Sequence, residues 1–200
     1  MGFVIFGAMG LYLLISLGVV AWAISHAKKN GKSAKRWGWG AALVMFMIPC
    51  WDWIPTVATH QYYCAKDSGF WVYKTLDQWK AENPGVMETL IENKGAPSTR
   101  QGDMGNFTDT YFLNQRINMV VKEHRLLSLL SNHLLERELV DTKTTEVLAR
   151  YTDYWSGGNP ITEGLAGLKF WLHSERCRDS GAHNDAQFDE LESKFTGRQK

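Results

Sequence analysis

The hydrophobic pattern begins with two long apolar stretches separated by a short polar segment. Residues 2–24 contain no charged side chain, and residues 37–58 contain one, Asp52. A helix of about 20 apolar residues crosses the hydrocarbon core of a bilayer, so we predict a membrane-spanning helix in each stretch. Tryptophan prefers the level of the lipid headgroups, and the second stretch carries two pairs of this residue, one near each end. These residues are Trp37, Trp39, Trp51 and Trp53.

Each apolar stretch also has an alternative interpretation. A charge inside a membrane is costly and marks a functional site, but Asp52 lies near the end of its stretch, so we expect it in the interface with Pro55. The first stretch lacks the basic start and the short apolar region of a signal peptide, which favours a retained anchor. A Gly38-x-x-x-Ala42 spacing in the second stretch would allow close helix packing.

The polar segment between the two stretches, residues 25–36, is strongly basic. It contains five basic residues and no acidic one: Lys28, Lys29, Lys32, Lys35 and Arg36. Short loops rich in Lys and Arg stay in the cytoplasm, so we predict a bacterial inner-membrane protein with both termini outside the cytoplasm. The alternative is a patch that binds nucleic acid or acidic lipid, but the two flanking spans favour a topological role.

Beyond residue 58 the pattern changes to short elements separated by turns. Residues 70–74 are aromatic and β-branched, typical of a strand, and Thr75 is suited to cap a helix that Asn83-Pro84-Gly85 ends. Residues 93–106 are polar and predict a loop. Alternation and turn residues predict three antiparallel strands, although the leucine-rich part of 116–140 is also compatible with a helix. The predicted strands cover residues 116–123, 134–141 and 146–153.

The C-terminal part adds helical patterns to these strands. Thr162 is suited to cap a helix with an apolar face, residues 188–195 predict a frayed helix, and the last residues are polar. We therefore predict an α+β fold: a two-helix transmembrane hairpin followed by a small extracytoplasmic domain with an antiparallel sheet and a few helices. The boundaries are residues 1–58 for the hairpin, 59–178 for the domain and 179–200 for a polar tail.

Two segments, "FWVYKTLDQWKAENPG" at residues 70–85 and "VDTKTTEVLARYTDYWSGG" at residues 140–158, carry a resemblance. They resemble segments of uncharacterised small two-span bacterial inner-membrane proteins. The resemblance implies an extracytoplasmic domain with a hairpin and transfers no active residue. In the pattern of these proteins a Gly follows Lys-Thr in the turn, whereas this chain has Thr145. Because Gly accepts a positive φ and Thr does not readily, we expect a different turn geometry here.

The three cysteines differ in their surroundings. Cys50 lies within an apolar stretch, whereas Cys64 and Cys177 lie in the outer portion, where an oxidising compartment would let them form a disulfide. The alternative is a catalytic thiol at Cys177, with His173 and His183 nearby in the sequence. We expect no metal site, since the chain has no Cys-x-x-Cys or His-x-x-x-His spacing.

Other catalytic signals are weak, and we expect no cofactor. The chain contains no P-loop, no dinucleotide-binding fingerprint and no G-x-S-x-G or H-E-x-x-H motif. Glu136 and Glu138 would share a face of a strand, where they could act as an acid–base pair or as a solvated strand edge. "RDSGAH", residues 178–183, fits an exposed turn better than a triad. Beyond residue 58 the chain has 17 basic and 20 acidic residues, so we expect no nucleic-acid binding.

Aromatic residues are concentrated just after the second apolar stretch. Most belong in a core, but some are candidates for a partner surface. These candidates are Tyr62, Tyr63, Phe70 and Trp71. The partners expected are the lipid bilayer and either another envelope protein or a second copy of the chain. We therefore predict a non-catalytic, membrane-anchored binding or assembly protein. Two alternatives are an envelope hydrolase or thiol enzyme, and an immunity or superinfection-exclusion membrane protein.

Overall fold

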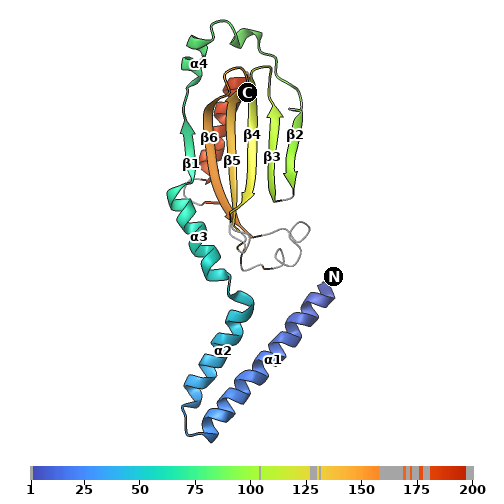
Figure 1. Ribbon diagram of the computed structural model, residues 1–200, viewed down its shortest axis with the longest axis vertical. Helices are drawn as coiled ribbons and strands as arrows, with labels where there is room; N and C mark the ends of the chain where they lie inside the picture. Colours follow the sequence, from blue (N-terminus) through green and yellow to red (C-terminus); the bar gives the residue numbers. More distant parts are fainter. Residues whose placement is uncertain are drawn as a thin grey trace. The chain divides into compact units, whose positions relative to one another are not determined.

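The computed structural model describes residues 2–103, 105–126, 130, 132–157, 169, 172, 176–177 and 181–196 (Figure 1). The chain divides into two compact units, Met1–Asp52 and Trp53–Lys200. The described part of the first unit is helical, and the second unit is built around a six-stranded antiparallel sheet. The α+β class expected from the sequence is confirmed.

Helices α1 (Gly2–Lys29) and α2 (Ala34–Cys50) form the N-terminal unit. Many of their large apolar side chains are exposed, which is unfavourable in water and typical of a surface that meets lipid or another protein. Within the described part of the chain, α1 is long and apolar enough to cross a membrane. Helices α2 and α3 (Trp53–Lys66) reach that length only if they are taken together across the break between them.

The predicted span at residues 37–58 is therefore not one continuous helix. Helix α2 ends at Cys50, and α3 begins at Trp53 after a two-residue turn. Pro55 explains the break, because a proline ring clashes with the carbonyl four residues earlier, here that of Trp51. In the first turn of a new helix the missing N–H of Pro55 costs nothing. Asp52, expected in the membrane interface, is only 2% exposed in the protein.

Helices α1 and α2 pack closely at two points. A Cβ atom added to Gly38 would lie 3.0 Å from Cγ1 of Ile24, so the missing side chain permits the approach. Pro49 lies inside α2 and cannot donate to the carbonyl of Met45, four residues earlier. The hydroxyl of Tyr12 on α1 donates to that carbonyl instead. A neighbouring helix thus satisfies the backbone group that the proline leaves unpaired.

The sheet has the strand order β1-β6-β5-β4-β3-β2, and every neighbouring pair is antiparallel (Figure 1). Strands β2 to β6 follow one another as a meander, and β1 joins the edge beside β6. The strands are β1 (Gly69–Val72), β2 (Ser98–Asp103), β3 (Asn106–Phe112), β4 (Ile117–Arg125), β5 (Asn132–Asp141) and β6 (Glu146–Ser156). The other described helices are α4 (Leu76–Glu82), η1 (Met87–Thr89) and α6 (Gly181–Thr196).

Local signals in the sequence predicted several of these elements. Thr75 caps α4 with a capping box completed by Gln78, and β4 to β6 cover the three strands predicted at 116–153. The loop predicted at residues 93–106 is wrong in part, because β2 lies within it. Strand β2 is exposed along its whole length and therefore lacks an apolar alternation. The expectation that Thr145 changes the turn geometry is wrong, because Thr145 adopts φ +58°, the positive value that a glycine would favour.

Helix α6 covers one face of the sheet and completes the hydrophobic core (Figure 1). Phe188 and Phe195 on α6 are fully buried, and Trp79 of α4 packs edge-on against Phe195. The sequence prediction assigned residues 179–200 to a polar tail, but most of that stretch is this helix. The buried core residues are Trp79, Leu113, Ile117, Leu135, Leu139, Leu148, Ala149, Tyr151, Phe188 and Phe195.

The opposite face of the sheet carries a different set of side chains. Tyr151 contacts Phe188 of α6, and since side chains alternate along a strand, Arg150 and Thr152 point to the other face. The register places Glu138 beside Arg150 and Glu136 beside Thr152. We call this surface the open face, although its Tyr154 end is covered by Tyr63 of α3 and Glu138 is only 5% exposed. Its members used below are Trp71, Thr110, Lys122, Glu136, Glu138 and Arg150.

Candidate functional site

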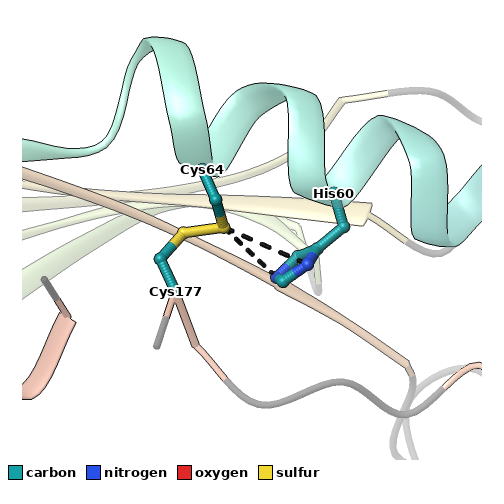
Figure 2. A group of neighbouring side chains, drawn as sticks. All are labelled: His60, Cys64 and Cys177. Atoms are coloured by element: carbon teal, nitrogen blue, oxygen red, sulfur yellow. Dashed lines mark hydrogen bonds between the residues drawn. A yellow bond between two sulfur atoms is a disulfide. The ribbon is translucent and has the colours of Figure 1, made fainter. Parts of the chain in front are cut away.

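Helix α3 brings a histidine and a cysteine together at its C-terminal half. His60 and Cys64 are four residues apart, so they lie on the same face of the helix. Cys64 forms a disulfide with Cys177, across a sequence separation of 113 residues and with the two Cα atoms 5.4 Å apart (Figure 2). The disulfide predicted from the sequence is thus confirmed. It ties α3 to the chain just before α6.

The imidazole of His60 lies against the disulfide. Its Nε2 is 3.5 Å and its Nδ1 4.0 Å from the sulfur of Cys64. Nε2 is also 3.2 Å from the main-chain carbonyl oxygen of Tyr154 on β6. Figure 2 shows the ring turned towards the bridge from the helix that carries Cys64. The ring therefore connects the bridge on one side with the backbone of the sheet on the other.

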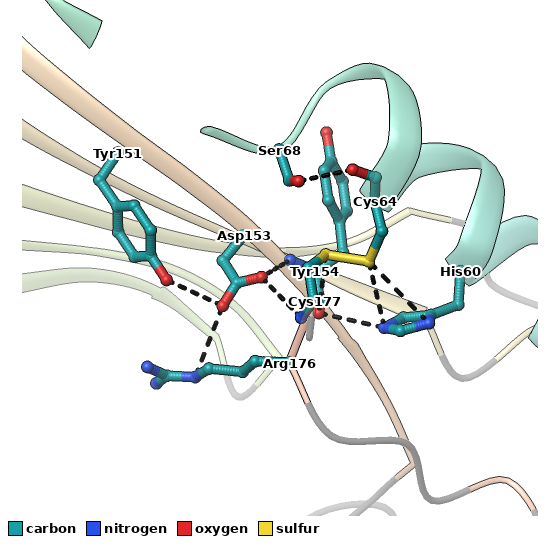
Figure 3. The surroundings of a disulfide bond; sticks show 8 residues. All are labelled: His60, Cys64, Ser68, Tyr151, Asp153, Tyr154, Arg176 and Cys177. Carbon is teal, nitrogen blue, oxygen red and sulfur yellow. Dashed lines mark hydrogen bonds and ion pairs between the residues drawn. A yellow bond between two sulfur atoms is a disulfide. The ribbon is translucent and has the colours of Figure 1, made fainter. Parts of the chain in front are cut away.

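Asp153 holds the other half of the disulfide in place (Figure 3). Its Oδ1 accepts hydrogen bonds from the backbone N–H groups of Tyr154 at 2.8 Å and Cys177 at 3.1 Å. Its Oδ2 accepts from the hydroxyl of Tyr151 at 2.9 Å and lies 3.9 Å from Nε of Arg176. Asp153 is 1% exposed, so these donors replace the water that the carboxylate loses.

Two tyrosines next to Asp153 keep their protons over the physiological range. Burial, followed by the charge of Asp153 and the hydrogen bond to it, raises the pKa of Tyr151 far above its usual value. Burial also raises the pKa of Tyr154 to about 12. The ring of Tyr154 stacks on Tyr63 of α3, with centroids 5.2 Å apart. Both tyrosines therefore act as neutral packing and hydrogen-bonding groups, not as bases.

The alternative of a catalytic thiol at Cys177 does not fit this arrangement. Cys177 is bonded to Cys64 and is 4% exposed. His183 lies on α6, where its ring is 3.0 Å from the side-chain amide of Gln187. His173 and residues 178–180 lie outside the described residues. In its oxidised state the bridge leaves no thiolate at Cys177 to act as a nucleophile.

Glu136 and Glu138 share the open face, as the alternation indicated. Lys122 donates to both, at 2.9 Å and 2.7 Å, and Arg150 makes two hydrogen bonds to Glu138. Burial raises the pKa of Glu138, but the hydrogen bonds from Lys122 and Arg150 outweigh it, and the pKa lies below its ordinary value. A general acid needs a raised pKa, so Glu138 is better described as part of an ion-pair cluster.

The four aromatic candidates for a partner surface point in different directions. Phe70 packs on Phe188 in the core, while Trp71 points to the open face and is 41% exposed. Tyr62 is 57% exposed beside Lys66, and Tyr63 contacts Tyr154. Neighbouring strand residues alternate between faces, which separates Phe70 from Trp71. Trp71 and Tyr62 therefore remain as exposed candidates.

The topology candidates lie around the connection between α1 and α2. Lys28 and Lys29 end α1, and Lys35 and Arg36 lie in the first turn of α2. Lys32 lies 5.0 Å above the ring of Trp37, in a cation–π geometry. The tryptophans expected at the membrane interface, Trp37, Trp39, Trp51 and Trp53, are all exposed by 40% or more.

Sequence reasoning missed the role of His60. The pattern His-x-x-x-Cys at residues 60–64 is the signal, because ligands four residues apart on a helix face the same way. His60 and Cys64 form a mixed pair, unlike a Cys-x-x-Cys or His-x-x-x-His motif, and the third member, Cys177, is too distant in the chain to join a local motif. No family model matches the chain, and neither the curated proteins nor the solved structures compared with it give a match.

Proposed function

We propose that this protein is a non-catalytic binding or assembly protein of the bacterial envelope. Its N-terminal helices anchor it in the inner membrane, and its α+β domain lies outside the cytoplasm. The observation that carries the proposal is the Cys64–Cys177 disulfide, because such bonds persist in oxidising compartments and are rare in the cytosol. This bond supports an extracytoplasmic position of the domain.

The distribution of charge supports the same orientation. Five bases lie at the α1–α2 connection, and a basic loop of this kind resists translocation. Helix α1 exposes a continuous apolar surface that a bilayer would cover. With the loop inside, a chain that crosses the membrane twice returns its C-terminal domain to the outside, where the disulfide can form.

The open face of the sheet is the surface that we assign to a partner protein of the envelope. Helix α6 covers the other face, and Figure 1 shows it behind the strands. The open face carries two basic and two acidic side chains that form ion pairs with one another, so their charges sum to zero. These residues are Lys122, Arg150, Glu136 and Glu138. Trp71 lies at the edge of this face. Trp and Arg are enriched in protein interfaces, and this face offers both in Trp71 and Arg150.

The orientation is tested by labelling single cysteines in intact cells, in a Cys50→Ser background. Ile91 is 69% exposed in the outer domain, so Ile91→Cys should react with a membrane-impermeant maleimide. Asn30→Cys, in the basic loop, is the matched control and should react only after the cells are opened. Reaction of Asn30→Cys in intact cells, with protection of Ile91→Cys, would contradict the orientation and the compartment.

The partner surface is tested with a photo-crosslinking residue placed at Thr110 on the open face. The expected result is one adduct with a distinct envelope protein, identified by mass spectrometry and weakened by Trp71→Ala. The same residue at Ile91, which lies outside the sheet, should give no such adduct. Equal crosslinking from both positions, or an adduct that contains only a second copy of this chain, would contradict an assigned partner at this face.

A further inference from the structure

The ring of His60 and the sulfurs of Cys64 and Cys177 form a compact group of three metal-ligand residues. Their ligand atoms all lie within 4.8 Å of one another. Imidazole nitrogen and thiolate sulfur are the ligands that Zn²⁺ takes most often in proteins. A sulfur in a disulfide is not a thiolate, however, so the group is not competent to bind an ion while the bridge is closed.

The distances around His60 are close to those of a tetrahedral zinc site. With Zn–N near 2.0 Å and Zn–S near 2.3 Å, a ligand nitrogen and sulfur lie about 3.5 Å apart and two sulfurs about 3.8 Å apart. Nε2 of His60 is 3.5 Å from the sulfur of Cys64, and Nδ1, the nitrogen that faces away from the carbonyl of Tyr154, is 4.0 Å from it, so a small rotation of the ring is enough to bring Nδ1 to ligand distance. The Cα atoms of Cys64 and Cys177 are 5.4 Å apart, so side-chain rotation can separate two reduced sulfurs without moving the backbone.

The surroundings of the group supply the support that zinc ligands need. A ligating histidine normally donates its other ring N–H to a carbonyl or carboxylate, and Nε2 of His60 lies 3.2 Å from the carbonyl of Tyr154, which leaves Nδ1 for a metal. Asp153 fixes the backbone of Cys177. Cys177 is buried, whereas His60 and Cys64 are half-buried, so the group is anchored on one side and accessible on the other.

We propose that reduction of the Cys64–Cys177 bond creates a Zn²⁺ site with His60, Cys64 and Cys177 as protein ligands and water in the fourth position. A dithiol reductant supplies two electrons and two protons and leaves as a disulfide, so that the protein gains two thiols. Zn²⁺ then displaces one proton from each thiol, and two protons are released for each ion bound. This site does not depend on the partner proposed above.

The test uses the full chain with Cys50→Ser in detergent micelles, reduced with a dithiol and then freed of the reductant. Titration with Co²⁺ alone should produce a thiolate-to-cobalt charge-transfer band and the visible bands of tetrahedral cobalt. Zn²⁺ should abolish both bands, and this competition gives the Zn²⁺ affinity. The same protein with its bridge intact should show neither band. Loss of one ligand in His60→Ala should weaken Zn²⁺ binding by about 100-fold or more.

Two further variants separate ligation from a general effect on folding. His60→Cys supplies another soft ligand from the same position and should retain the tetrahedral bands, whereas His124→Ala, at an exposed position on β4, should bind like the unmodified protein. Zn²⁺ should also raise the thermal midpoint of the reduced protein. Equal Zn²⁺ affinity in the parent and His60→Ala, cobalt bands in the bridged protein, or a reduced protein that does not fold with Zn²⁺ would overturn the proposal.

Discussion

At the scale of single residues, Thr145 carries identifiable backbone strain. Its φ of +58° is in the left-handed region, where a β-branched side chain is disfavoured by about 1–2 kcal/mol. Its N–H nevertheless donates to the carbonyl of Asp141 at 2.8 Å and closes the β5–β6 turn. The register of the hairpin therefore sets the backbone conformation, and the residue adapts to it.

We expect Thr145→Gly to raise the free energy of unfolding by about 1 kcal/mol. Glycine removes the clash of Cβ, and the larger entropy of the unfolded chain offsets part of that gain. Urea denaturation of the two proteins measures the difference. Thr145→Ala, which keeps Cβ, is the matched control and should gain less. A glycine variant no more stable than the parent would show that this turn is unstrained.

Asp141 joins three parts of the domain from a buried position. It is 1% exposed, and it accepts hydrogen bonds from the indole of Trp79 at 2.8 Å and from two nitrogens of Arg116 at 3.1 Å and 2.7 Å. The backbone N–H of Lys143 donates to it as well. Burial raises the pKa of Asp141, but these donors outweigh burial, and the pKa lies below its ordinary value.

Asp141→Asn should lower the free energy of unfolding by about 3 kcal/mol near neutral pH, since it leaves Arg116 without its charge partner. A carboxyl with a lowered folded pKa stabilises the fold above its unfolded pKa of about 3.9, and this contribution is lost as the pH falls through the folded pKa. The difference between the variant and the parent should therefore shrink below about pH 4.

Urea denaturation at several pH values measures this dependence on Asp141. Asp103→Asn, an equal change of charge at an exposed position, is the control and should keep the parent's loss of stability at low pH. If the difference between Asp141→Asn and the parent were the same at pH 7 and pH 3, ionisation of Asp141 would not contribute to stability.

At the scale of secondary structure, Arg137 fastens α6 to the sheet. It lies on β5 and forms ion pairs with three acidic residues of the helix: Asp185 at 2.6 Å, Asp189 at 2.8 Å and Glu192 at 3.3 Å. Its guanidinium also lies 4.5 Å from the ring centroid of Phe188. One cation thus pairs with three acids on one flank of the helix, while Phe188 and Phe195 are buried in the core on another.

Arg137→Met should loosen α6 and lower the free energy of unfolding by about 1–2 kcal/mol. Methionine keeps much of the packing but leaves Asp189 and Glu192 without Arg137, while Asp185 keeps its contact with Arg176 at 3.4 Å. The partial exposure of these acids limits the cost. Hydrogen exchange should speed up in α6 more than in β4. The effect should diminish at high salt, which screens the acids from one another. Unchanged exchange in α6 would show that its apolar side alone holds it.

The elements that the sequence predicted are those in which one face is buried. In β4 the alternate residues Ile117, Met119 and Val121 pack in or against the core, and the cap at Thr75 is a local signal. Strand β2 is exposed along its length and gives no alternation. Helix α6 has apolar residues at positions 188, 191 and 195, which form a narrow face in the core. Because most of its other residues are polar or charged, the sequence pattern indicated a polar tail instead.

The candidate site was also predictable only in part from the sequence. Residue type and number predicted the disulfide, since only two cysteines lie outside the apolar stretches. The position of His60 against that bond depends on how α3 packs along β6, which brings the ring to the carbonyl of Tyr154, 94 residues away. Local spacing cannot encode an approach of this kind. The same holds for β1, which pairs with β6 across most of the domain.

At the scale of the whole molecule, the proposed orientation and the disulfide make a joint prediction. If the five bases at the α1–α2 connection keep that loop inside, replacing all five with Gln should leave part of the population with its outer domain in the cytosol. That fraction should lack the Cys64–Cys177 bond, because the cytosol keeps thiols reduced. The bases are Lys28, Lys29, Lys32, Lys35 and Arg36.

Trapping of free thiols in rapidly acidified cells, followed by a gel-shift reagent, counts the reduced fraction directly. In a Cys50→Ser background the parent should show no free thiol, and the loop variant should show two in the misoriented fraction. A protein in which Lys80, Lys94 and Lys143 are replaced with Gln loses exposed bases from the outer domain instead and should remain fully bridged. If every molecule of the loop variant still contained the disulfide, a feature other than these five charges would orient the chain. The reason is that the cytosol keeps thiols reduced, so a domain held there would lose this bond.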